Sequence, residues 1–250
     1  MKTIVFIVSA PSGSGKTTLT DELRKNVPRL IFSVSYTTRA ARGSEKNGNE
    51  YFFVSREEFE RMIGEDQFLE HAEVFGNYYG TARRFLDEAE ERGDDLILDI
   101  DVQGAAQVRK KLPEAVSIFI LPPSREELER RLRRRTITEN EERRKLTGES
   151  KSAEEIEATI GRRLQAASRE IENYRQYDYI VVNEKVEEAI DVFQRVVQAQ
   201  RLKRSPEPVR AGDEQVAATA EMAERRHMMD KVQTILATFL VGSNNDKKPE

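Results

Sequence analysis

The sequence predicts an α/β fold in which a parallel sheet is flanked by helices. Short apolar runs alternate along the chain with longer segments of helical composition. Strands that alternate with helices favour a parallel sheet with right-handed crossovers. The first apolar run, residues 3–8, has the length and the β-branched composition of a strand buried in such a sheet. A turn rich in glycine and serine follows it directly.

That turn, residues 10–17, has the sequence Ala-Pro-Ser-Gly-Ser-Gly-Lys-Thr, and residues 16–25 have helical composition. A strand, a glycine-rich turn and a helix in this order predict a phosphate-binding P-loop, whose backbone N–H groups face a β-phosphate. Lys16 would then reach the β- and γ-phosphates, and the Thr17 hydroxyl would ligate Mg²⁺. Ala10 replaces the usual first glycine, but the Gly-Lys-Thr ending favours a P-loop over a plain connector.

The composition restricts the class of protein. The 250 residues suffice for a sizeable core and suggest one domain with insertions or two small domains. The formal net charge of -4 disfavours a nucleic-acid-binding surface. The absence of cysteine excludes disulfides and thiolate sites, and two distant histidines disfavour a zinc site. Because no apolar stretch is long enough for a membrane span or a signal peptide, the sequence predicts a soluble, cytoplasmic protein without membrane or nucleic-acid partners.

A second apolar run, residues 30–35, predicts another strand and leads into a segment with two arginines. Arg39 and Arg42 stand three apart beside hydroxyl residues, and planar guanidinium groups bind phosphate oxygens in pairs. A solvated arginine pair is the commoner outcome for such a pattern. The P-loop before it nevertheless favours a clamp for a second phosphate.

Five further elements are predicted in the next segment. Residues 50–54 have strand composition, and Ser55 begins a helix with a capping box. Residues 68–74 alternate apolar and polar side chains, as a half-buried strand does. Residues 76–81 are predicted as a glycine-bounded turn with two exposed tyrosines, and a helix follows over residues 81–92.

The run over residues 96–101 is a predicted strand that ends in carboxylates. Asp99 and Asp101 would therefore lie at the carboxyl end of a strand, where open α/β sheets bind ligands. P-loop enzymes hold a magnesium-associated aspartate at this place. A helix over residues 103–112 and a buried strand over residues 116–121 follow.

The remaining core is mainly helical. Ser124 begins a helix rich in arginine, and a polar stretch separates it from a long helix that begins at Ser152. Residues 179–183 are the last predicted strand, and residues 187–202 are the closing helix.

A tail follows this core. Residues 205–212 have linker composition, and residues 213–241 show helical periodicity. One face of this helix would present Met229, Val232, Leu236 and Phe239 or Leu240. This face predicts a helix that docks on the protein's own core. The alternative is a helix that binds a partner, so the tail helix is a candidate interface of a homo-oligomer.

Six motifs, in order, resemble those of bacterial guanylate kinases, and the resemblance covers residues 3–203. The motifs are residues 9–17, 35–42, 68–72, 76–81, 98–104 and 120–124. The resemblance implies a P-loop kinase core, a small mixed α/β GMP-binding region and a mobile helical lid, and this chain departs from the family by an insertion in the lid. The corresponding ranges are 1–32 and 83–203 for the core, 33–82 for the GMP-binding region, 125–170 for the lid, about 136–152 for the insertion, and 204–250 for a linker and helical tail.

For GMP, the resemblance implies two groups of ligands. They are Arg39, Arg42, Tyr51 and Tyr79 for the phosphate, and Ser35, Glu70, Thr81 and Asp101 for the guanine. The chemistry agrees, because guanine offers O6 and N7 as acceptors and its N2 amine as a donor. An ionised carboxylate only accepts hydrogen bonds, so Glu70 suits the donor edge and disfavours adenine. Taken alone, a surface glutamate is the commoner interpretation of Glu70.

For ATP, the resemblance implies a set that comprises Ser12, Gly13, Ser14, Gly15, Lys16, Thr17, Thr18 and Asn183, with Asn183 near the adenine. Catalysis would depend on Lys16, on Asp99 and on the lid arginines Arg131, Arg135 and Arg163. Charge stabilisation and positioning are what phosphoryl transfer requires of a protein. Thr17 and Asp99 would associate with the cofactor Mg²⁺. Thr136 replaces a common glycine of the family, and the insertion over residues 136–152 lengthens the lid at little cost in stability.

The expected activity is that of an ATP:GMP phosphotransferase, a nucleoside monophosphate kinase of purine nucleotide metabolism. Its small-molecule substrates would be ATP and GMP, and its products ADP and GDP. A related kinase of ribose bisphosphates is one alternative, but it would have no use for the guanine ligands. A non-catalytic guanylate-kinase-like binding module is another. Such modules typically have degraded phosphate loops, whereas Gly15, Lys16 and Thr17 are all present.

Overall fold

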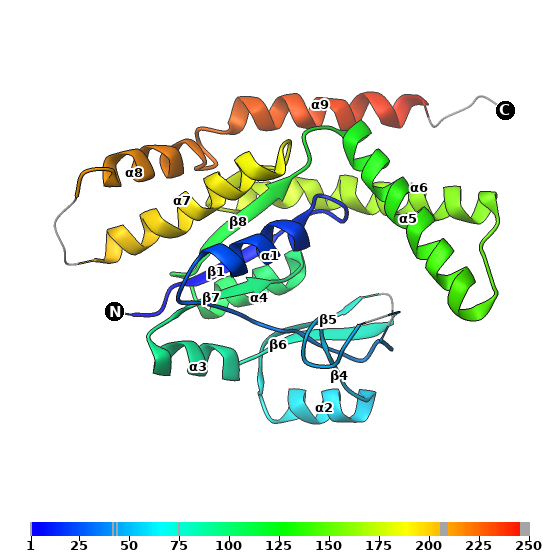
Figure 1. The fold of residues 1–250 in the computed structure, drawn as a ribbon, viewed down its shortest axis with the longest axis horizontal. Helices are drawn as coiled ribbons and strands as arrows, with labels where there is room; N and C mark the ends of the chain where they lie inside the picture. The colour runs from blue at the N-terminus through cyan, green and yellow to red at the C-terminus, as the bar shows by residue number, and fades with distance from the viewer. Residues whose placement is uncertain (1, 42, 44, 75, 206–209, 246–250) are drawn as a thin grey trace. The chain divides into compact units, whose positions relative to one another are not determined.

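The computed structural model describes residues 2–41, 43, 45–74, 76–205 and 210–245 (Figure 1). The chain forms two compact units. The first comprises the residues up to Ser9 together with Arg24–Ser117, and the second comprises Ala10–Leu23 and Ile118–Glu250. The glycine-rich turn and most of the following helix, α1 (Lys16–Asn26), therefore belong to the second unit.

The first unit contains the parallel strands β2-β7-β1. β1 (Val5–Ser9) pairs with β7 (Asp95–Asp99), which pairs on its other side with β2 (Leu30–Phe32). All five residues of β1 are buried, as expected for a parallel strand that is covered on both faces. In the chain, α3 (Arg84–Arg92) comes directly before β7, and α4 (Val102–Lys111) comes directly after it. The predicted strand–helix alternation is confirmed here.

A second sheet of the first unit has the order β4-β3-β6-β5. Its members are β3 (Tyr36–Thr37), β4 (Phe52–Phe53), β5 (Phe68–Val74) and β6 (Asn77–Ala82), and α2 (Arg56–Gly64) packs on it. The small core between them contains Phe59, Met62 and Phe68. The Ser55 hydroxyl accepts the Glu58 N–H at 3.1 Å and so caps α2 at the predicted residue.

The prediction of a turn over residues 76–81 is wrong. Residues 77–82 form β6, which pairs antiparallel with β5 from Val74 opposite Asn77 to Phe68 opposite Ala82. The reversal is confined to the residues just before β6, where Gly76 has a φ of 79°. The two tyrosines therefore belong to a strand, and the helix expected from residue 81 begins at Arg84.

The second unit contains β8 (Val116–Leu121) from Ile118 onward, and this part pairs in parallel with β9 (Tyr179–Val182), with Ile118 opposite Tyr179. Both strands occur where the sequence predicts them. The helices of this unit are α5 (Arg125–Thr147), α6 (Ala153–Glu170), η1 (Ile171–Gln176), α7 (Val186–Arg204), α8 (Asp213–Met222) and α9 (Met229–Asn245). None of the helices in the described part of the chain is both long and apolar enough to cross a membrane.

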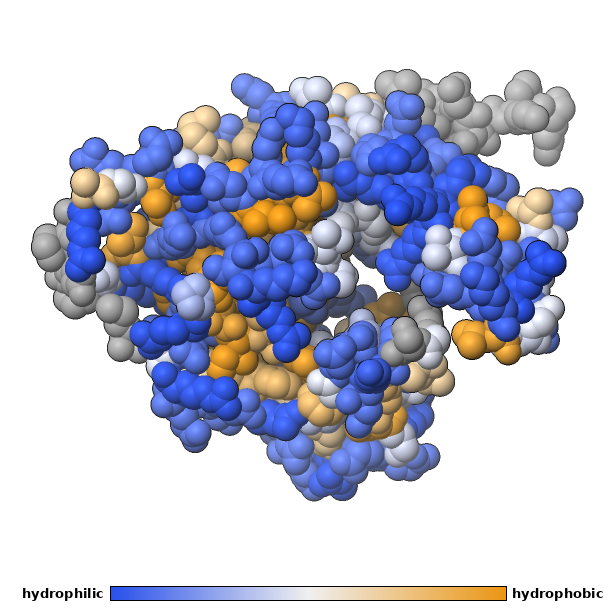
Figure 2. Space-filling model, in the orientation of Figure 1, coloured by the Kyte–Doolittle hydropathy of each residue, from blue (hydrophilic) through white to orange (hydrophobic). Residues whose placement is uncertain are grey.

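The polar stretch predicted between two helices is largely helical itself. α5 continues to Thr147 and ends where Gly148 adopts a φ of 76°, and α6 begins with a complete capping box at Ser152. Glutamate, arginine and lysine between them are good helix formers, and no proline interrupts them. The two helices form a hairpin (Figure 1), whose surface is mainly hydrophilic on the face shown in Figure 2.

The tail docks within its own unit. The Ile180 N–H of β9 donates to the Ala223 carbonyl at 2.8 Å, so the tail pairs with the free edge of this strand. This pairing interrupts the single helix predicted over residues 213–241, which is instead α8 and α9. Val232 and Phe239 of α9 are buried, which confirms the prediction that the apolar face of the tail docks on the protein's own core.

Candidate active site

The P-loop owes its shape to two glycines with left-handed backbone. Gly13 and Gly15 have φ values of 91° and 88°, which side chains rarely permit. A Cβ at Gly13 would lie 2.9 Å from Leu132 of α5, and one at Gly15 would overlap the Asn183 amide nitrogen. Backbone conformation and close packing therefore both require glycine at these positions.

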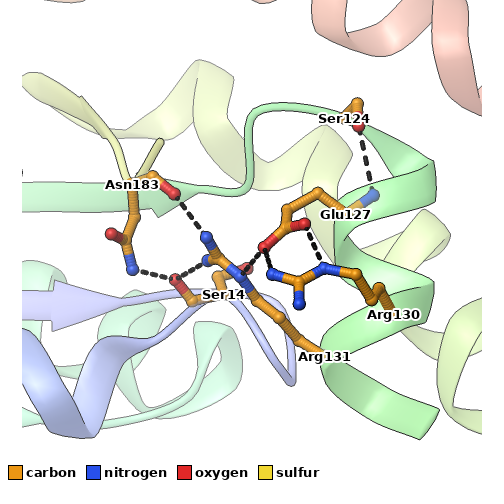
Figure 3. A network of polar contacts seen from close by, with 6 residues as sticks. All are labelled: Ser14, Ser124, Glu127, Arg130, Arg131 and Asn183. Atoms are coloured by element: carbon orange, nitrogen blue, oxygen red, sulfur yellow. Dashed lines mark hydrogen bonds and ion pairs between the residues drawn. The ribbon is translucent and has the colours of Figure 1, made fainter. Parts of the chain in front are cut away.

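A polar network joins the P-loop to α5 and to the end of β9 (Figure 3). The Asn183 side-chain amide, 2% exposed, donates to the Ser14 carbonyl at 2.8 Å. Arg131 donates to the Asn183 carbonyl at 3.0 Å and through Nε to Glu127 at 2.7 Å. Glu127 also accepts two bonds from Arg130, and these hydrogen bonds lower its pKa to about 2. The network holds Arg131 beside the phosphate loop.

Two polar atoms of this network are buried without a hydrogen-bond partner among the described residues. They are the Asn183 Oδ1 and the Ser14 Oγ. Beside them, the Ser12 N–H at the start of the loop donates to the Glu170 carboxylate at 3.3 Å. A backbone N–H group of the loop thus donates to a negatively charged group, as an anion-binding turn requires.

The other two predicted lid arginines meet at one carboxylate. Arg135 donates through Nε to Glu139 at 2.8 Å, and Arg163 donates to the second oxygen of Glu139 at 2.8 Å. Arg163 also donates to the Thr136 hydroxyl at 3.1 Å. The hairpin of α5 and α6 therefore brings Arg135 and Arg163 together.

In the first unit, Arg39 lies among aromatic and acidic groups. Its two terminal nitrogens bind the two oxygens of Glu45 at 2.9 Å each, and its guanidinium lies 5.2 Å from the Tyr51 ring centre. The hydrogen bond to Glu45 is the main cause of the raised pKa of Arg39, and Tyr79 contributes to it. The Tyr51 and Tyr79 rings meet edge to face with centres 6.0 Å apart. Arg42 lies outside the described residues.

Glu70 is a buried carboxylic acid on β5, only 4% exposed. Burial, with a further contribution from the negative charge of Asp101, raises its pKa to about 7. Thr81, also buried, lies opposite it on β6. A Cβ at Gly104 of α4 would overlap the Glu70 carboxylate, so the side chain fills the space that this glycine leaves.

Asp101 and Gln107 fix α4 to its surroundings. Asp101 is the N-cap residue of α4 and accepts the Gly104 N–H at 2.8 Å. The Gln107 amide donates to the His71 carbonyl at 2.7 Å and accepts the His71 N–H at 3.3 Å. β5 thereby gains two bonds at its free edge, which fix Glu70 next to the N-terminus of α4. Ser35, the remaining predicted guanine ligand, is half-buried just before β3.

Comparison with known proteins identifies the family. The guanylate kinase family model matches residues 1–200. The chain belongs to the guanylate kinase family. A guanylate kinase of Koribacter versatilis is 52% identical over 239 residues, which cover 96% of this chain and 97% of that protein. A guanylate kinase of Escherichia coli K12 is 45% identical over 203 residues, which cover 80% and 90%.

A solved structure agrees. The crystal structure of guanylate kinase from Anaplasma phagocytophilum has a TM-score of 0.62 and 36% identity, with 81% of this chain and 88% of that chain covered. The Koribacter alignment omits only a few residues of this chain, so it includes most of the tail beyond the family match. This guanylate kinase therefore shares a tail of similar length with one relative.

The predicted ligands of GMP and of ATP lie in different units of the chain. All predicted GMP ligands that the structure describes lie in the first unit, as does Asp99 at the end of β7. The predicted ATP ligands and the lid arginines lie in the second unit. The described GMP ligands therefore share one unit and the ATP ligands the other, whereas the catalytic set is divided between the units by Asp99.

Several partners of these ligands were not predicted. They are Glu45, Glu127, Glu139 and Glu170. The four-residue spacings of Glu127 with Arg131 and of Arg135 with Glu139 were visible as helical pairs. Glu45 lies in a loop six residues after Arg39, and Glu170 is 158 residues from Ser12, so neither pair has a helical spacing that the sequence could reveal.

Proposed function

We propose that this guanylate kinase transfers the γ-phosphoryl group of ATP to GMP, forming ADP and GDP. The buried Glu70, together with the Arg39 cluster in the same unit, carries this proposal. A phosphate clamp and a buried acceptor suit a guanine monophosphate better than either alternative of the sequence analysis. The intact P-loop of the second unit supplies the nucleoside triphosphate site.

The GMP phosphate would bind Arg39, Arg42, Tyr51 and Tyr79. Arg39 offers a planar fork, and its bidentate pair with Glu45 demonstrates that a two-oxygen anion fits it. The phosphate would replace the Glu45 carboxylate on this fork. The tyrosine hydroxyls then complete the anion site.

Guanine would bind Glu70, Thr81, Asp101 and Ser35. Its N2 amine is a donor, and an ionised Glu70 supplies acceptors only. Because burial penalises the charged carboxylate, binding of guanine donors would draw Glu70 towards its ionised form. Adenine has no donor at the corresponding edge and would leave that buried charge without a partner.

The residues proposed for Mg²⁺ fit the chemistry of that ion. Thr17 lies exposed at the start of α1 and Asp99 at the end of β7, and both offer oxygen. Mg²⁺ binds through one or two protein oxygens plus phosphate oxygens and water, and when bound it neutralises the β- and γ-phosphates. Among the described residues, no group of three or more histidine or acidic side chains is arranged to hold a metal ion by itself.

The transfer itself needs no nucleophilic side chain. A GMP phosphate oxygen attacks the γ-phosphorus in line, the bond to the β-phosphate oxygen breaks, and ADP leaves with that electron pair. Lys16 and the backbone of the P-loop would hold the β-phosphate. Arg131, Arg135 and Arg163 would stabilise the charge on the phosphoryl group in transfer. Asn183 would support the loop and offer its unpartnered oxygen to the adenine amine.

The test is a coupled assay of ADP release with ATP and Mg²⁺. GMP, AMP, CMP, UMP and ribose 1,5-bisphosphate are offered in parallel, with the Lys16→Ala variant as a control. Turnover with GMP alone, lost in the control, is the expected result. Turnover with ribose 1,5-bisphosphate, or none with any acceptor, would refute the proposal. The cytoplasmic location and the homo-oligomer remain predictions.

A further inference from the structure

The lid of this chain differs from the expected family pattern at Thr136 and in the insertion that follows it. Because α5 runs on through the insertion, the helix extends well beyond Arg135. Glu139 lies four residues after Arg135 and therefore about one helical turn further along the same face. A short connection after Arg135 would leave no helix to present a side chain there.

Glu139 and Thr136 together hold Arg163, which comes from the opposite helix. One terminal nitrogen of Arg163 donates to Glu139 at 2.8 Å, and the other donates to the Thr136 hydroxyl at 3.1 Å. Thr136 is buried, and its own hydroxyl donates to the Leu132 carbonyl at 2.8 Å. This bond orients the oxygen lone pairs towards Arg163. Both departures from the family pattern thus converge on one arginine.

The electrostatics favour a role beyond a surface ion pair. Two guanidinium groups that share one carboxylate would otherwise repel each other. Burial alone would raise the pKa of Glu139, but its hydrogen bonds to Arg163 and Arg135 lower the pKa below the usual value. The carboxylate is therefore charged at neutral pH and holds both cations within reach of one another.

The arrangement leaves the terminal fork of Arg135 open to a ligand, whereas Arg163 uses one N–H of each terminal nitrogen for Thr136 and Glu139 and keeps the rest of its five N–H groups. Arg135 uses Nε for Glu139, and within the described part of the chain its two terminal nitrogens have no hydrogen-bond partner. Its side chain is 58% exposed, against 27% for Arg163. The terminal nitrogens of Arg135 therefore remain open to phosphate oxygens, while its Nε is held by Glu139.

We propose that Glu139 is a positioning residue that assembles Arg135 and Arg163 into a phosphate-binding pair before the nucleotide arrives. Thr136 accepts the second hydrogen bond that holds Arg163 in place. The inference rests on the proposed function, because it takes the two arginines as ligands of the transferring phosphoryl group. Groups that are already oriented need no reorganisation at the moment of reaction, and this preorganisation is what makes electrostatic catalysis effective.

The experiment compares steady-state kinetics of the wild-type chain with Glu139→Gln. The matched control is Glu142→Gln, which makes the same change of charge at an exposed position of the same helix. We expect kcat to fall about tenfold in Glu139→Gln, as the loss of a charged hydrogen bond predicts, with the KM for GMP unchanged. The control should keep the wild-type kcat.

A double-mutant cycle tells positioning from general weakening of the lid. If Glu139 acts through Arg163, Glu139→Gln should reduce kcat little further in an Arg163→Gln background. Equal losses in both backgrounds would refute the inference, as would a wild-type kcat or a lowered KM for ATP in Glu139→Gln. The last result would make Glu139 a competitor of the phosphates. Absence of GMP phosphorylation by the wild-type chain would instead refute the proposed function.

Discussion

Replacing Glu70 with glutamine should stabilise the ligand-free protein at alkaline pH. The pKa of Glu70 rises from 4.5 in an unfolded chain to about 7 in the folded protein. Between these values the folded protein binds more protons than the unfolded chain, so the free energy of unfolding falls as the pH rises. A tenfold change in proton affinity corresponds to about 1.4 kcal/mol, so the full loss above pH 7 is about 3 kcal/mol. Glutamine cannot ionise and escapes this loss.

Urea unfolding at about pH 5 and about pH 8 measures the effect. The variant should exceed the wild type by about 1 kcal/mol at the lower pH, where Glu70 of the unfolded chain is already largely ionised, and by about 3 kcal/mol at the higher pH. Glu73→Gln is the control, because Glu73 is exposed on the same strand. GMP should stabilise the wild type more than Glu70→Gln, since guanine donors favour the ionised acid. A stability difference that does not vary with pH would refute the assignment of a raised pKa to Glu70.

Two further substitutions test the acceptor site and the tail. Gly104→Ala should raise the KM for GMP about tenfold and leave the KM for ATP unchanged, because its Cβ displaces the Glu70 carboxylate. Gly161→Ala, with open space around its Cβ, is the matched control, and an unchanged KM for GMP in Gly104→Ala would contradict the packing argument. Thr238→Val should lower the free energy of unfolding by about 1 kcal/mol, since the Thr238 hydroxyl accepts the first N–H of α5, that of Arg125, at 2.9 Å. Chemical unfolding measures this, and an unchanged midpoint would show that the cap contributes nothing.

The elements that the sequence predicts well are those with a local physical signal. The buried run before the P-loop, the N-caps at Ser55 and Ser152, and the glycine after α3 each act within a few residues. Their outcome therefore depends little on the rest of the fold. The same holds for the P-loop, whose glycines are required by backbone conformation at the turn itself.

The secondary-structure predictions fail where pairing with residues distant in the sequence determines the local conformation. Residues 76–81 contain glycines that suggest a turn, but pairing along the whole of β5 makes them a strand. The tail has one helical periodicity, yet the open edge of β9 captures Ala223 and breaks the helix. The exchange of backbone hydrogen bonds across a sheet is invisible to a local pattern. Glu45, the acceptor of the Arg39 fork, was missed for a different reason: it lies only six residues after Arg39, but in a loop, where no helical or strand periodicity links the two residues.

The carboxylates that sequence analysis missed share a physical purpose. Arg39, Arg131 and the Arg135–Arg163 pair each donate to a glutamate in the structure. A site built to stabilise transferring phosphate must gather cations, and gathered cations repel one another while no phosphate is present. A glutamate on each group offsets that repulsion and keeps the guanidinium planes oriented. Where the glutamate binds the Nε side, as on Arg135, it can stay when phosphate arrives. Where it fills the terminal fork, as Glu45 does on Arg39, it must leave, so the two clamps should respond to loss of their glutamates in opposite ways.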